Sequence, residues 1–201
     1  MKLRFSPTSP YVRKVMVTAI ELGIMAEIEK VPTNPWDPAT DIATDNPIGK
    51  VPALTLDDGR VLFDSVVICE YLDASAGGSL FPTVGDARWT ALRRHALADG
   101  ALDAGVSRFL ERNRPDGERS ESWIARQTTV LGRGLDAMEA EADGLGDGIT
   151  IGHIAFGCTL GWADFRCPDE DWRAERPALA DWFDTFSARK SMMETVPKLP
   201  K

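Results

Sequence analysis

The sequence of 201 residues predicts an α/β domain at the N-terminus followed by an all-helical domain. Three observations predict this class. Short apolar runs near residues 3–5, 53–56 and 61–63 are separated by turn residues and by segments of helical spacing. A Gly- and Pro-containing segment interrupts the pattern at residues 76–86, and beyond it apolar residues recur only at helical spacing. We therefore expect one domain at residues 1–78, a linker at 79–86 and a second domain at 87–201.

The first domain is expected to open with a strand at residues 3–5, a turn at 6–9 and a helix. Pro10 suits the first helical position and Ser9 suits the cap. Apolar residues then recur at helical spacing until Gly23, and an alternating segment at residues 26–31 predicts a second strand. The hydroxyl of Ser9 and the positive end of the helix dipole coincide, and both favour a thiolate.

A proline begins the next apolar run. Pro52 cannot donate a hydrogen bond to a sheet, so it belongs at the first residue or on the edge of a strand. If the Val51–Pro52 bond is cis, the N–H and C=O groups of Val51 turn outward. An extended tripeptide would then pair with Val51 as an added strand.

Asp64 and Ser65 follow a turn at residues 57–59 and a short strand at 61–63, and they are expected to cap and open a helix. The N–H groups at a helix start suit a carboxylate, and the Asp64 side chain suits an ammonium group. The γ-glutamyl end of glutathione offers both. Each feature alone is also typical of strand punctuation or helix capping, but their ordered series favours a binding site. The order of elements is that of a thioredoxin-like domain.

The chain resembles the glutathione S-transferase family over essentially its whole length, in particular bacterial members with a Thr-Ser-Pro-aromatic-x-Arg-Lys start. The matching segments are Thr8-Ser9-Pro10-Tyr11-Val12-Arg13-Lys14, Asn46-Pro47-Ile48-Gly49-Lys50-Val51-Pro52, Phe63-Asp64-Ser65 and Ala98-Asp99-Gly100-Ala101-Leu102-Asp103-Ala104. The resemblance implies the glutathione transferase fold and a glutathione site that includes Ser9, Lys50, Val51, Pro52, Asp64 and Ser65. It implies that Ser9 donates a hydrogen bond to the glutathione sulfur. Thr8 is the competing donor.

The second domain is expected to contain long helices at residues 87–111 and 120–141, a buried central helix at 154–162 and a last helix that opens at Arg176. Ile149, Thr150 and Ile154 have the spacing of a hydrophobic staple around a helix cap. In the resembling family an Asp commonly completes this capping box. This chain has His153 there, which leaves the chemistry of the cap open.

Four charged residues of the first long helix are candidates for a second part of the site. Asp99 and Asp103 lie one turn apart, a pattern usually explained by solvation or by pairing with arginines. The resemblance implies instead that this face borders the active site and a two-fold dimer contact, with Asp99 near the γ-glutamyl amine. Arg108 and Arg112, with Phe109, either line the acceptor pocket or are exposed helix residues.

Composition limits the other classes of function. The net charge of −8 argues against a nucleic-acid surface. No signal peptide or membrane span is recognisable, so a cytoplasmic protein is expected. Of the three cysteines, Cys69 and Cys158 are expected in the core, and none begins a helix or forms a CxxC motif. This argues against an enzyme that uses its own thiol. Two histidines are too few for a convincing metal site.

The sequence therefore predicts a cytoplasmic, homodimeric, glutathione-dependent transferase with a role in detoxification. Glutathione is the expected co-substrate, and no metal is expected. The activated thiol would attack a small electrophile or reduce a peroxide or a disulfide. The alternative is a non-enzymatic member of the same fold that binds another protein, and the retained Ser9, Val51, Pro52, Asp64 and Ser65 favour the enzyme.

Overall fold

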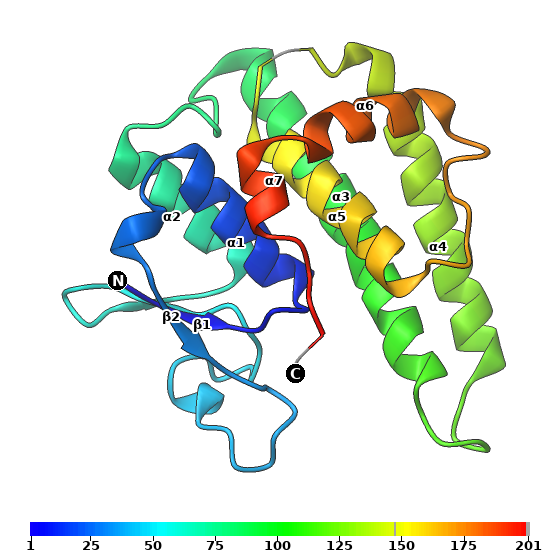
Figure 1. The fold of residues 1–201 in the computed structure, drawn as a ribbon, viewed down its shortest axis with the longest axis horizontal. Helices are drawn as coiled ribbons and strands as arrows, with labels where there is room; N and C mark the ends of the chain where they lie inside the picture. Colours follow the sequence, from blue (N-terminus) through cyan, green and yellow to red (C-terminus); the bar gives the residue numbers. More distant parts are fainter. Residues whose placement is uncertain (147, 200–201) are drawn as a thin grey trace. The chain divides into compact units, whose positions relative to one another are not determined.

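The computed structural model describes residues 1–146 and 148–199, which divide into two compact units. One unit contains Met1–Thr83 together with the segment that starts at Lys190, and the other contains Val84–Arg189 (Figure 1). The sequence had assigned residues 87–201 to a single helical domain. The segment that starts at Lys190 contacts the N-terminal unit through a residue that is distant in the sequence. The buried Arg13 donates hydrogen bonds to the Met192 carbonyl at 3.1 Å and to the Thr195 hydroxyl at 3.3 Å.

The N-terminal unit contains a four-stranded mixed sheet in the order β2-β1-β3-β4. The strands are β1 (Lys2–Phe5), β2 (Glu29–Pro32), β3 (Leu54–Thr55) and β4 (Val61–Leu62). β1 pairs in parallel with β2 and antiparallel with β3, and β3 pairs antiparallel with β4. Helices α1 (Pro10–Glu21) and α2 (Ser65–Ala76) pack against each other, and the short α7 (Lys190–Glu194) packs on α1. The predicted strand at residues 26–31 is wrong at its start. The N–H groups of Glu27 and Ile28 close a 3₁₀ turn, η1 (Met25–Glu27), so the ladder with β1 begins at Glu29.

The start of α1 follows from the local sequence. Ser9 caps α1 and Pro10 is its first residue, as predicted. A second 3₁₀ turn, η2 (Ile42–Thr44), lies in the long connection between β2 and β3. The core of the unit is made by apolar residues that α1, α2 and the strands each turn inward. Fully buried members include Leu3, Val15, Leu54, Ile68 and Leu72.

The helical unit is built around α5 (Ile151–Arg166), which is buried without interruption from Ile151 to Ala163. The other helices are α3 (Gly85–Arg112), α4 (Glu121–Glu139) and α6 (Pro177–Ser187), with a 3₁₀ turn η3 (Ala142–Gly144) after α4. Figure 1 shows α3 running beside both α4 and α5, and these pairs form the main contacts of the unit. The predicted central helix at 154–162 is therefore correct in place but too short at both ends.

Close helix packing in this unit depends on a glycine. A Cβ atom at Gly105 of α3 would lie 2.5 Å from the ring of Trp162 on α5. The six-membered ring of Trp162 thus occupies the space that a side chain would fill, and Trp162 itself is 3% exposed. None of the helices in the described ranges combines the length and apolar character needed to cross a membrane.

The start of α5 resolves the question of the capping box. The N–H of Thr150 donates to Nδ1 of His153 at 3.1 Å, and the backbone N–H of His153 donates to the Thr150 side chain. His153 thus does at this position what a carboxylate would do, with a ring nitrogen as the acceptor. The hydrogen bond from the Thr150 N–H requires an unprotonated Nδ1, so in the neutral ring the proton is on Nε2.

Candidate functional site

The sheet register brings three sequence-predicted segments to one edge. Because β3 runs antiparallel to both β1 and β4, the end of β1, the start of β3 and the end of β4 lie at the same edge. A hydrogen bond from the Arg4 N–H to the Ala53 carbonyl at 2.9 Å extends this pairing beyond β3. Ser9 follows β1, Val51 precedes β3 and Asp64 follows β4. The candidate glutathione-binding residues are therefore gathered by topology.

Val51 presents unused backbone groups at this edge. The Val51–Pro52 peptide bond is cis, as the sequence analysis considered. Within the parts of the chain that the structure describes, neither the N–H nor the C=O of Val51 takes part in a hydrogen bond. Two backbone groups of one residue are thus available to pair with an extended peptide.

The loop before Val51 is held by Asn46, whose role the sequence analysis did not assign. Asn46 is 2% exposed, and its Nδ2 donates to the Lys50 carbonyl at 2.7 Å. Its Oδ1 accepts from the Ile48 N–H at 3.0 Å, and its backbone carbonyl accepts from the Gly49 N–H at 2.8 Å. These bonds close the loop on itself and leave the Lys50 side chain exposed. The Asn-Pro-x-Gly pattern is typical of such a self-bonded turn and was the signal for this role.

At the start of α2, Asp64 offers an oxygen that attracts a cation, and Ser65 offers donors that attract an anion. Asp64 is exposed, and its Oδ1 accepts from the Val66 N–H at 3.0 Å, which confirms the predicted cap. The Phe63–Asp64 peptide bond is also cis. Oδ2 of Asp64 has no partner among residues 1–146 and 148–199, and the same is true of the Ser65 N–H and hydroxyl. A carboxylate oxygen thus lies beside an N–H, a hydroxyl and the positive end of a helix dipole.

Ser9 and Thr8 both stay candidates for the sulfur partner. The Ser9 oxygen accepts from the Val12 N–H at 3.2 Å, which uses a lone pair and leaves the hydroxyl proton to donate. Thr8 is half-buried, and in the described chain no hydrogen bond engages its hydroxyl. Both residues lie at the N-terminus of α1, where the helix dipole favours negative charge.

None of the three cysteines belongs to the first turn of α1 or of α2. Cys69 and Cys158 are buried in α2 and α5, which confirms that they belong to the core. Cys167 is the cap residue just after α5 and is half-buried, with Nη2 of Arg108 3.0 Å from its sulfur. Burial raises the pKa of the Cys167 thiol, although the charge of Arg108 opposes this change.

The four charged residues of α3 are placed in two separate environments. Oδ2 of Asp99 lies 3.2 Å from Nε2 of His95, one turn away, and Asp103 is exposed. Arg108 is 1% exposed, and its guanidinium contacts Glu170 at 2.9 Å. Arg112 contacts the same carboxylate at 2.9 Å. Arg108 is thus not the exposed helix residue that one interpretation expected, and a contact of either arginine with an acceptor stays a prediction.

Glu170 explains why these arginines are held in place. Burial opposes its ionisation, but hydrogen bonds from Arg112 and Arg108 lower its pKa below the ordinary value. The carboxylate is therefore charged at neutral pH and joins α3 to the segment after α5.

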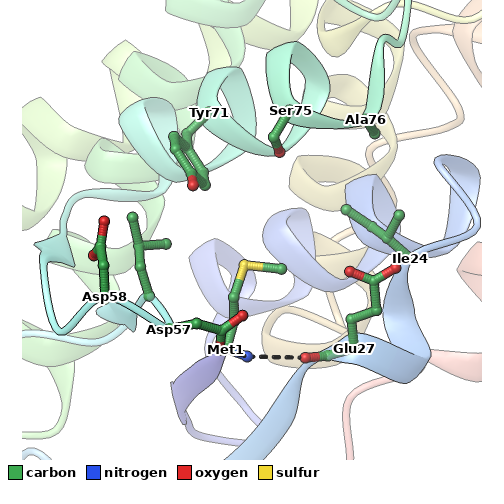
Figure 2. Close-up of a pocket in the computed structure, with 9 residues that line it drawn as sticks. Met1, Ile24, Glu27, Asp57, Asp58, Tyr71, Ser75 and Ala76 are labelled. Atoms are coloured by element: carbon green, nitrogen blue, oxygen red, sulfur yellow. Dashed lines mark hydrogen bonds and ion pairs between the residues drawn. The ribbon is translucent and has the colours of Figure 1, made fainter.

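A cavity of about 460 Å³ lies elsewhere in the N-terminal unit (Figure 2). In Figure 2, Tyr71 and Ser75 of α2 face Met1 and Ile24 across the open space, and the Met1 amino group donates to the Glu27 carbonyl at 3.1 Å. Its lining comes from the start of β1, the residues after α1, the β3–β4 turn and the last turns of α2. These are the opposite ends of the elements that carry Ser9, Val51 and Asp64. The unpaired hydrogen-bonding groups converge instead at the edge with Val51.

Across the described residues, no group of three or more His, Cys, Asp or Glu side chains is arranged to hold a metal ion. The candidate site consists of backbone groups, hydroxyls, one carboxylate and the exposed ammonium group of Lys50.

Comparison with known proteins identifies the family. The model of the glutathione S-transferase N-terminal domain matches residues 8–75, and the model of the C-terminal domain matches residues 121–185. An uncharacterized GST-like protein of Escherichia coli (strain K12), YibF, is 33% identical over 201 residues, with 98% of each chain covered. The chain belongs to the glutathione S-transferase family.

Solved structures of glutathione transferases agree with this assignment. A family member from Pseudomonas fluorescens Pf-5, with bound glutathione, is 41% identical with a TM-score of 0.93, and the match covers 98% of this chain and 99% of that one. A glutathione S-transferase from Methylobacillus flagellatus KT, also with glutathione bound, is 36% identical with a TM-score of 0.92 and the same coverage. The predicted glutathione transferase fold, with a thioredoxin-like domain followed by helices, is thereby confirmed.

Proposed function

We propose that the protein is a glutathione-dependent transferase that holds the glutathione thiol as a thiolate for attack on a small electrophile. One observation carries the proposal. The unpaired groups of Val51, Asp64 and Ser65, with the hydroxyls of Ser9 and Thr8, gather at one edge of the sheet. Family membership and the glutathione-bound relatives support it.

Each part of glutathione has a partner in this arrangement. The cysteinyl residue would pair with the N–H and C=O of Val51 as an added antiparallel strand. The γ-glutamyl carboxylate would accept from the Ser65 N–H and hydroxyl at the start of α2, where the dipole is favourable. Its ammonium group would donate to the free Oδ2 of Asp64. The exposed Lys50 would attract the glycyl carboxylate.

Catalysis then depends on the protonation state of the sulfur. A free thiol has a pKa of about 8.5, so at neutral pH only a few per cent is thiolate. The Ser9 hydroxyl would donate to the sulfur, and the α1 dipole would favour its negative charge. A pKa lowered by one unit corresponds to about 1.4 kcal/mol, which such a bond can supply.

The chemical step is a displacement. The thiol proton passes to solvent, the thiolate sulfur forms a bond to the electrophilic carbon, and the leaving group departs with its bonding electrons. Ser9 keeps its proton throughout, so it stabilises the thiolate and is not a nucleophile. The same thiolate would attack the oxygen of a peroxide, which breaks the O–O bond and releases hydroxide or an alkoxide, or the sulfur of a disulfide, which breaks the S–S bond and releases a thiolate. Because reduced glutathione is abundant in the cytoplasm, we place the enzyme there.

The first experiment measures glutathione binding by calorimetry and turnover with an aryl halide, a peroxide and a mixed disulfide. Binding with turnover of one or more acceptors is expected. Absence of glutathione binding would contradict the proposal. Binding without turnover of any acceptor would support the non-enzymatic alternative.

The second experiment separates Ser9 from Thr8. We expect Ser9→Ala to lower kcat about tenfold to a hundredfold, with little change in glutathione affinity, because one hydrogen bond to a charged sulfur is lost. Thr8→Ala is the matched control. The pH titration of the ultraviolet absorbance of the bound thiolate gives the sulfur pKa in each variant. If only Thr8→Ala raises it, Thr8 is the donor. If neither variant does, the helix dipole and backbone are responsible.

A further inference from the structure

Arg166, the last residue of α5, is held between two aromatic rings. Its Cζ lies 4.6 Å from the centroid of the Phe109 ring and 4.5 Å from that of the Phe165 ring. Phe109 comes from α3, and its ring meets Trp162 nearly edge-on, with centroids 6.5 Å apart and an angle of 85° between planes. Trp162 is fixed in turn against Gly105. One side of the Phe109 ring is thus fixed against the buried Trp162, while Phe109 and Phe165 both stay half-exposed beside the guanidinium.

The Arg166 guanidinium has no counter-ion in the part of the chain that the structure describes. Within residues 1–146 and 148–199, no hydrogen bond or ion pair engages it. Arg108 and Arg173, by contrast, each contact a carboxylate. Arg126 and Arg133 also have no partner in the described ranges, but both are exposed to water. Arg166 is half-buried, so water replaces the missing carboxylate only in part.

The absence of a carboxylate is unexpected for this composition. The chain has 31 acidic residues against 23 lysines and arginines, so acceptors exceed cations. Buried charges are usually paired, because removal from water is costly, and a half-buried guanidinium bears part of this cost. Burial alone lowers the pKa of Arg166, with no nearby carboxylate to oppose it. An anion from outside the chain would offset this cost.

We propose that Arg166 binds the carboxylate or sulfonate of a planar aromatic compound. The rings of Phe109 and Phe165 contact the guanidinium. Its N–H donors have no partner in the described chain and match the two oxygens of a carboxylate in a bidentate geometry. The same rings are half-exposed and offer surface to the aromatic body of the ligand. Inorganic anions would use only the charge, so an aromatic anion fits this site better.

The proposed binding site, made of Arg166, Phe109 and Phe165, lies entirely within the unit Val84–Arg189. That the bound compound is also the acceptor substrate rests on the proposed transferase function. The acceptor would then be an aromatic electrophile that carries an acidic group.

Direct binding tests the site without turnover. Calorimetry measures the affinity of the full-length protein for 4-nitrobenzoate and for its uncharged analogue 4-nitrobenzamide, without glutathione. We expect Arg166→Gln to weaken nitrobenzoate binding about tenfold or more and to leave nitrobenzamide binding unchanged. Arg166→Lys, which keeps the charge but loses the planar fork, should give an intermediate loss. Arg133→Gln, at an exposed arginine without a partner in the described chain, is the matched control and should bind like the parent protein.

Kinetics tests the assignment to the acceptor. With glutathione present, Arg166→Gln should raise KM for 4-chloro-3-nitrobenzoate about tenfold and leave KM for 4-chloro-3-nitrobenzamide unchanged. If neither the parent protein nor any variant turns over an acceptor, but the parent protein still binds nitrobenzoate, the proposed transferase function is refuted and the anion site is supported. Nitrobenzoate affinity that is undetectable in the parent protein, or equal in Arg166→Gln, would overturn the site. A loss of glutathione affinity in Arg166→Gln would overturn it too, because the anion would then be glutathione itself.

Discussion

Acidification is expected to destabilise the protein through His153, the ring that completes the cap of α5. His153 is 5% exposed, and Nδ1 accepts from the Thr150 N–H at 3.1 Å. Among the described residues, Nε2 is buried without a partner. Burial, followed by the positive charges of Arg94 and Arg189, lowers the pKa of His153 from 6.5 to about 4. Protonation would turn the acceptor Nδ1 into a second donor that faces the Thr150 N–H.

The sign and the size of the effect follow from this lowered pKa. Between pH 6.5 and pH 4 the unfolded chain binds a proton that the folded chain does not, so stability falls as pH falls through this range. The difference of about 2.5 pH units corresponds to about 3 kcal/mol at most. At pH 5 the expected loss from this group is about 2 kcal/mol relative to pH 8. Well above pH 6.5, by about pH 8, the ring is neutral in both states, and the contribution is constant.

The assay is urea denaturation at several pH values for the parent protein and His153→Asn. Oδ1 of Asn takes the place of Nδ1 as the acceptor but does not titrate, so the other titrating groups cancel in the difference. We expect the free energy of unfolding of the parent protein, relative to the Asn variant, to decrease by about 2 kcal/mol from pH 8 to pH 5. A difference that is constant over this range would refute the argument.

Three further predictions concern the site, the packing and the assembly. Asp64→Ala should weaken glutathione binding by about 1–3 kcal/mol, because the ammonium group loses its charged acceptor; unchanged calorimetric affinity would contradict the assignment, and Asp58→Ala is the control. Gly105→Ala should lower the free energy of unfolding by about 1–3 kcal/mol, because its Cβ would overlap Trp162, whereas Gly100→Ala in open space on α3 should be neutral or stabilising. A homodimer, expected from the resemblance that places Asp99 and Asp103 at a two-fold contact, should scatter light with twice the 22.0 kDa mass of one chain; a monomer mass at micromolar concentration would refute it.

The features that the sequence predicted well are those whose partners are close along the chain. Ser9 and Asp64 cap helices whose acceptor and donor atoms lie two or three residues apart. The same holds for Thr150 and His153, although only the structure showed that a ring nitrogen replaces the usual carboxylate. The long amphipathic helices were predicted for a related reason, because their apolar spacing is a local property. Their ends were less accurate, since terminal turns depend on neighbouring contacts.

The tertiary structure decided the features that depend on partners far apart in the sequence. The sequence contains no signal that Arg13 would bind the carbonyl of Met192 and bring the C-terminal segment to the N-terminal unit. The sequence also allowed two interpretations of Arg108, as an exposed helix residue or as a residue of the acceptor pocket. Only the structure showed that Arg108 is buried and paired with Glu170. The place of Arg166 beside Phe109 is of the same kind. Capping and periodicity are fixed by the nearest residues, whereas the pairing of a buried charge depends on which distant segment the folded chain brings beside it.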